Sequence, residues 1–153
     1  MLEICLVVLI LALIATLAVP SVTGLLAERR LRESLYALDD LAATAQRRSM
    51  AEGKTYLLVW APRNAGIQLC PEELSAKERA ALPPTLTPAA VAGGHYELTL
   101  PAALVANAQA EWAFWPSGNC EPAIVRYSGP AGRWTASYQP LTARSTLVEF
   151  HPR

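Results

Sequence analysis

The fold is decided by the first stretch of the chain, LEICLVVLILALIATLAVPS at Leu2–Ser21. Within it, Ile4–Val19 is an uncharged and almost wholly apolar run, and apolar residues continue beyond Pro20. A helix that spans a bilayer needs about 20 such residues, so the stretch suffices if the helix continues past the proline. Proline is tolerated as a kink in a membrane helix or a helix bundle. We therefore predict a transmembrane or assembly segment over residues 1–26, kinked at Pro20.

The charges around this run leave three interpretations open. A cleaved secretory signal requires a basic residue before the run, but the only charge there is Glu3. An ordinary signal anchor would leave the rest of the chain in the cytoplasm, because the arginines at 29, 30 and 32 follow the run. In the third interpretation, a short basic leader is missing from the sequence. Since a carboxylate beside an apolar helix is costly, Glu3 is either an interfacial charge or the partner of a cation inside an assembly.

The residues that follow keep the helical period but become amphipathic. Apolar residues recur at spacings of three and four, no proline interrupts them, and Gly53 is a stop signal. The charged residues lie mostly off this stripe, which indicates a solvated face. With the first segment, this makes one helix of about 50 residues and roughly 75 Å, too long for a compact domain of this size. The stripe consists of Ala27, Leu31, Leu35, Leu38, Ala42 and Ala45.

Leu2–Ser21 resembles the N-terminus of mature type IV pilins and type II secretion pseudopilins. That family carries a glutamate near its processed end, then an apolar run and a proline, and the separation of Glu3 and Pro20 matches its register. The resemblance implies that a basic leader and the first mature residues are missing here, and that the mature N-terminal residue is methylated. It also implies that Glu3 pairs with the N-terminal amine of a neighbouring subunit.

After Gly53 the pattern shifts towards a period of two, which is typical of strands. Short segments rich in β-branched and aromatic residues alternate with turn signals such as Pro116–Asn119. These segments predict an antiparallel β domain whose four tryptophans pack mainly in the core. The seven predicted strands are Lys54–Trp60, Gly66–Cys70, His95–Leu100, Glu111–Trp115, Ala123–Ser128, Arg133–Tyr138 and Ser145–His151.

The stretch between Pro71 and Gly94 interrupts the strands. Ser75–Glu78 has the spacing of a capping box and predicts one helical turn. The predicted fold class is therefore α+β, with a long N-terminal helix packed against a small antiparallel β-sheet domain. We expect the amphipathic half of the helix at residues 27–53 and the globular domain at residues 54–153.

Composition excludes several classes of function. The net charge is zero, which argues against a general nucleic-acid binder held by electrostatics. No catalytic or phosphate-binding motif occurs, so we expect no enzyme and no cofactor. His95 and His151 have no closely spaced partner, and we predict no metal site. The globular part contains no aspartate, which argues against the calcium loop of a major pseudopilin.

The C-terminal half resembles the GspH/FimT-like minor pseudopilins. The resemblance rests on WPSGN at Trp115–Asn119, GRWTASY at Gly132–Tyr138 and PLTAR at Pro140–Arg144. It implies a minor pseudopilin of type II secretion, with other pseudopilins, inner-membrane lipid and secreted cargo as partners. The expected location is the bacterial inner membrane, in a single pass, with the C-terminal domain in the periplasm.

Two other functions stay open. One is a minor pilin of a type IV pilus, used for adhesion, motility or DNA uptake, in which Arg144 and Arg153 are candidates for a weak DNA contact. The other is a membrane-anchored periplasmic enzyme or binding protein.

The three cysteines allow one intramolecular pair. Cys5 lies in the apolar run, where it is expected to pack as a small hydrophobe. Cys70 and Cys120 flank predicted strand ends, and the periplasm is oxidising. We therefore predict a disulfide between Cys70 and Cys120, with two buried thiols as the alternative.

Overall fold

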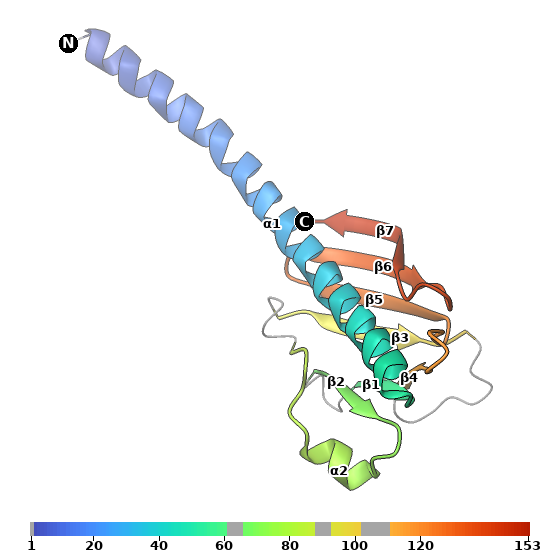
Figure 1. The fold of residues 1–153 in the computed structure, drawn as a ribbon. Helices are drawn as coiled ribbons and strands as arrows, with labels where there is room; N and C mark the ends of the chain where they lie inside the picture. The colour runs from blue at the N-terminus through green and yellow to red at the C-terminus, as the bar shows by residue number, and fades with distance from the viewer. Residues whose placement is uncertain (1, 61–65, 88–92, 102–110) are drawn as a thin grey trace.

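The structure, a computed structural model, describes residues 2–60, 66–87, 93–101 and 111–153, but not the side chains of residues 2–5, 10–23, 76 and 80. Helix α1 (Leu2–Glu52) is 51 residues long and continues through Pro20, as predicted. It ends at Gly53, whose φ of 66° is a left-handed conformation that glycine adopts without strain. The N-terminal half of α1 projects away from the rest of the molecule (Figure 1). Among the residues described, no helix has the length and apolarity that crossing a membrane requires.

All seven predicted strands are present, and each begins and ends within two residues of its predicted position. They form two sheets in which every neighbouring pair is antiparallel. The first sheet has the order β2-β1-β4, with β2 at Ile67–Pro71, β1 at Tyr56–Trp60 and β4 at Glu111–Phe114. The second has the order β3-β5-β6-β7, with β3 at His95–Thr99, β5 at Ala123–Gly129, β6 at Gly132–Tyr138 and β7 at Ser145–Pro152.

The main core lies between the second half of α1 and these two sheets, and it contains the predicted helix stripe. Ala42 and Ala45 are fully buried, and their small side chains let the sheets approach the helix closely. Trp112 from the first sheet and Trp134 from the second are the largest fully buried side chains. Trp115 differs from the prediction: it lies just beyond β4 and is 41% exposed.

A smaller apolar cluster lies apart from the main core. Leu57, Val59 and Cys70 form it, and Leu74 packs against it. Beyond Leu74, the capping box predicted at Ser75 is present and opens α2 (Ala76–Ala81).

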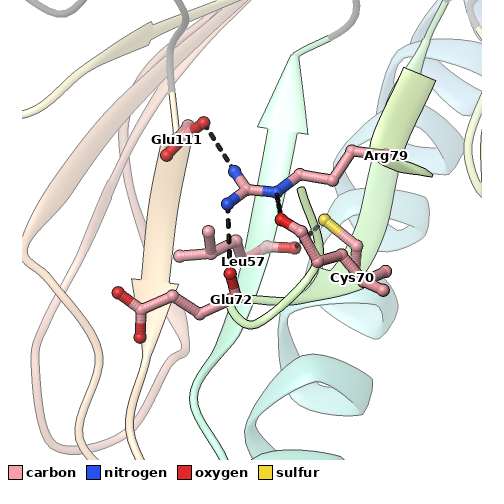
Figure 2. Close-up of polar contacts among 6 residues, drawn as sticks. Leu57, Cys70, Glu72, Arg79 and Glu111 are labelled. Carbon is pink, nitrogen blue, oxygen red and sulfur yellow. Dashed lines mark hydrogen bonds and ion pairs between the residues drawn. The ribbon is translucent and has the colours of Figure 1, made fainter. Parts of the chain in front are cut away.

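Arg79 of α2 ties this part of the chain to the first sheet. Its guanidinium donates to Glu111 Oε1 at 2.9 Å and to the backbone oxygens of Leu74 at 2.8 Å and Glu72 at 3.1 Å (Figure 2). Both side chains of the Arg79–Glu111 pair are less than one-third exposed, so the ion pair is partly shielded from water. Arg79 therefore has a structural role: it holds α2 against β4 and against the turn that follows β2.

Candidate assembly surface

Where the structure describes its side chains, the first half of α1 presents exposed apolar residues. Leu6, Val7, Val8 and Leu9 are each between 56% and 62% exposed. Leu25 is also 66% exposed, where the helix approaches the sheets. A contiguous apolar surface of this kind marks a site of protein or membrane contact. The candidate functional site is therefore the projecting half of α1, residues 2–26.

A buried polar network fixes the angle at which this helix leaves the domain. Ser34 is fully buried on α1 and donates to the Leu31 carbonyl oxygen at 2.6 Å. Its hydroxyl accepts from Trp134 Nε1 at 2.7 Å, and its backbone oxygen accepts from the Tyr96 hydroxyl at 3.0 Å. Two strands of the second sheet therefore hold one turn of the helix. Burial raises the pKa of Tyr96 far above its usual range, which keeps this phenol protonated as a donor.

A second contact lies about one turn further along α1. Both carboxylate oxygens of Asp39 accept hydrogen bonds, one from the Tyr138 hydroxyl at 2.6 Å and one from Ser145 Oγ at 2.8 Å. Burial, and next the negative charge of Asp39, raise the pKa of Tyr138 well above its usual range. The tyrosine thus remains a donor at any physiological pH. Asp39 joins β6 and the start of β7 to the helix.

The C-terminal end of α1 is held by the first sheet and the turn after β4. Ser49 Oγ lies within hydrogen-bond distance of two backbone oxygens, those of Lys54 at 2.7 Å and Phe114 at 2.9 Å, and its single proton is donated to this pair. Gln46 Nε2 donates to the Gly118 carbonyl at 2.5 Å. These contacts, with those of Ser34 and Asp39, attach the second half of α1 to both sheets.

The outward face of α1 near the domain is solvated, as the sequence predicts. Arg29 pairs with Glu33 at 3.1 Å and Arg32 pairs with Glu28 at 2.9 Å, both at the i,i+4 spacing. Exposed pairs of this kind contribute only a few tenths of a kcal/mol each. Arg32 also lies over the ring of Phe150 on β7, at 5.2 Å from its centroid.

The predicted site residues do not gather at one place. Glu3 and Pro20 are part of α1, but their side chains lie outside the described residues, so the assembly role of Glu3 and the kink at Pro20 stay predictions. Arg144 and Arg153 are exposed, and they lie at opposite ends of β7. Ser34 and Asp39 were not predicted as site residues from the sequence. The only sequence signal for them is that each is a polar residue on or beside the apolar helix stripe, and this signal does not show which strand each one contacts.

The predicted disulfide is wrong, because Cys70 and Cys120 are separate buried thiols. Cys70 lies opposite Leu57 on β1, whereas Cys120 lies opposite Phe114, which pairs with Tyr56 on the same strand β1. Three strand spacings thus separate the two cysteines, or roughly 14 Å at ~4.8 Å each. A disulfide requires Cα atoms within about 7 Å. The cysteines also belong to different apolar clusters.

This correction predicts the behaviour of both thiols. The intact mass of the chain should be the same with and without reductant, and neither thiol should react with an alkylating reagent until the domain unfolds. Burial raises the pKa of Cys70 and raises that of Cys120 to about 11, so both remain protonated at neutral pH. The measurement is mass spectrometry after alkylation of native and unfolded protein, in a Cys5→Ala background. If the unreduced chain is lighter than the reduced chain by two hydrogens, the two cysteines form a disulfide and the prediction of two free thiols is wrong.

His95 and His151 are both exposed, at the same end of the second sheet. Within the part of the chain that the structure describes, no group of three His, Cys, Asp or Glu side chains lies close enough to hold a metal ion.

A long helix that projects through its apolar first half and packs through its second half on a small antiparallel domain defines a pilin-like fold. No protein-family model matches the chain, and no curated protein sequence matches it. Among solved structures, the minor pseudopilin EpsH from the type 2 secretion system of Vibrio cholerae is similar, with a TM-score of 0.50 and 12% sequence identity. The match covers 78% of this chain and 96% of that one. The chain therefore has the fold of a minor pseudopilin.

Proposed function

We propose that the protein is a minor pseudopilin, a structural subunit near the tip of the periplasmic pseudopilus of a type II secretion system. The observation that carries this proposal is the uncovered apolar surface of α1, at Leu6–Leu9, on a pilin-like fold. Such a surface needs lipid before assembly and neighbouring helices afterwards. The protein's work is then assembly rather than catalysis.

In this proposal, residues 1–26 anchor the subunit in the bacterial inner membrane in a single pass, with the β domain in the periplasm. The apolar run at Ile4–Val19 supports this, since the helix continues past Pro20 and, with the apolar residues that follow, reaches the about 20 residues that a bilayer span needs. Glu3 pairs with the methylated N-terminal amine of a neighbouring subunit, and Pro20 kinks the helix within the bundle. Other pseudopilins are the partners along the helix, and the β domain contacts further tip subunits or secreted cargo.

The proposal is tested by assembly in cells that produce the other pseudopilins. The full-length chain should be extracted from membranes with detergent and should co-purify with those subunits. A chain that is found alone, or whose β domain faces the cytoplasm in a reporter fusion after Arg153, would contradict it.

A minor pilin of a type IV pilus is the second candidate. The exposed arginines at 144 and 153 favour it, since a pilin used in DNA uptake needs cations on its outer surface. Binding of duplex DNA that weakens steeply as salt rises, and that is reduced when both arginines are replaced by glutamine, would favour this candidate over a secretion subunit.

A further inference from the structure

One end of the second sheet collects basic side chains and no acidic ones. The strand ends at this edge are the residues 93–96, 127–133 and 150–153, and they carry two histidines and two arginines without an Asp or Glu. The turn between β5 and β6 and the end of β7 line a polar hollow of about 330 Å³. Its lining includes Ser128, Gly129, Gly132, Arg133, His151 and Arg153.

The hollow depends on a close approach of two backbones. Gly132 has a φ of 136°, and a Cβ placed there would lie 2.2 Å from the carbonyl oxygen of His151. The turn between β5 and β6 can therefore lie against the end of β7 only with glycine at this position. Arg153 N also donates to the Ala131 carbonyl at 3.0 Å, which holds the last residue beside this turn.

The described acidic side chains do not pair with the cations of this edge. Over the described ranges, Arg133, His151 and Arg153 make no ion pair. On α1, Arg29 and Arg32 are paired with glutamates, whereas Arg30 is exposed and makes no ion pair among the described residues. We define the basic rim as Arg30, Arg133 and Arg153, with His95 and His151 beside them.

Contacts between α1 and the sheet show which way this edge faces. Tyr138 contacts Asp39, Trp134 contacts Ser34, and Phe150 lies under Arg32. The start of β6 and the end of β7 therefore lie nearer to the N-terminus of α1 than the opposite ends of these strands do. The basic edge is the part of the sheet that lies closest to the projecting half of the helix, and the C-terminus is seen there in Figure 1.

We propose that the basic rim binds the phosphate groups of anionic lipid headgroups and holds the β domain against the membrane before the subunit enters a filament. This inference rests on the proposed function, since it needs residues 1–26 in the bilayer. The apolar stretch ends at Leu26, only four positions before Arg30, so the rim then lies at headgroup height. Each arginine at an anionic surface raises the ratio of membrane-docked to undocked β domain about fivefold, and three arginines raise it roughly a hundredfold.

The test uses the full chain in lipid nanodiscs, with a fluorophore on Pro130→Cys, at the exposed turn between β5 and β6, in a Cys5→Ala background. Quenching by a headgroup-attached nitroxide reports contact of the rim with the surface. In nanodiscs with about a third phosphatidylglycerol, quenching should be strong, and in pure phosphatidylcholine it should be weak. The triple variant R30Q/R133Q/R153Q should lower the ratio of docked to undocked domain about a hundredfold.

The matched control is R47Q/R48Q/R144Q, which removes the same charge from exposed arginines at the other end of the domain. It should quench like the parent chain. Equal quenching in both lipids, or an equal loss in both triple variants, would overturn the proposal. The proposal would also be overturned if inorganic phosphate abolished the quenching at matched ionic strength. Binding of duplex DNA to the rim that does not depend on lipid would overturn it as well.

Insertion is scored separately, as association of the chain with phosphatidylcholine nanodiscs. A chain that inserts but does not dock contradicts only the rim, whereas a chain that does not insert contradicts the proposed function itself.

Discussion

Replacing Trp134 with alanine should lower the free energy of unfolding of the domain by about 3–5 kcal/mol, the usual range for truncating a large buried aromatic. Trp134 is 1% exposed, stacks on Tyr127 with ring centroids 5.7 Å apart, and packs edge-on against Tyr96. Its indole also donates to the buried Ser34. The substitution therefore removes core packing and leaves a helix hydroxyl without its donor. Since domains are stable by about 5–15 kcal/mol, a large fraction of this stability would be lost.

The measurement is denaturant unfolding of the full chain in detergent, followed by circular dichroism. Trp115→Ala is the matched control, because Trp115 is 41% exposed and its loss should cost less than about 1 kcal/mol. Trp134→Phe keeps most of the ring and loses the donor, and it should cost an intermediate amount. Equal costs for the two alanine variants would show that the helix is not held by this network.

Replacing Glu3 with alanine should lower incorporation into the filament by at least about tenfold, while folding and membrane insertion persist. A carboxylate and an ammonium within an apolar bundle each lose hydration, and their pairing offsets this loss. If Glu3 pairs with a neighbour's N-terminal amine as proposed, removing the carboxylate leaves that amine buried and unpaired, which typically costs several kcal/mol. The pair also favours one axial register, since a slipped subunit leaves both charges unmatched.

The measurement compares co-purification with filament partners for Glu3→Ala and Glu33→Ala. Glu33 is on the same helix, but it is exposed and pairs only with Arg29, so its loss should leave incorporation unchanged. If Glu3→Ala assembles as well as Glu33→Ala does, Glu3 is only an interfacial charge.

Much of this fold was predictable from the sequence because its signals are local. The stripe from Leu31 to Ala45 has a helical period, the strands alternate with glycine and proline turns, and Ser75 begins a capping box. Each of these patterns depends on neighbours within a few residues, and each was confirmed. The uncovered half of the helix was also predictable, because no sheet of this size could bury its whole length.

The remaining features depend on contacts between distant residues. Ser34 and Trp134 are 100 residues apart, and Asp39 and Ser145 are 106 apart, so their pairing follows only from strand order. The disulfide prediction failed for the same reason. Cys70 is on β2 and Cys120 bridges to the end of β4, so the order β2-β1-β4 places both β1 and β4 between them.

Cross-linking in cells tests whether the projecting half of α1 contacts other filament subunits, as we propose. A photoreactive amino acid would replace Val8, which is 59% exposed on α1, or Arg126, which is exposed on β5, in cells that produce the secretion system. We expect the probe at position 8 to cross-link to the N-terminal helices of other pseudopilins in the assembled fraction, and the probe at position 126 not to do so. Cross-links from position 8 to lipid alone, in the presence of assembled filaments, would contradict it.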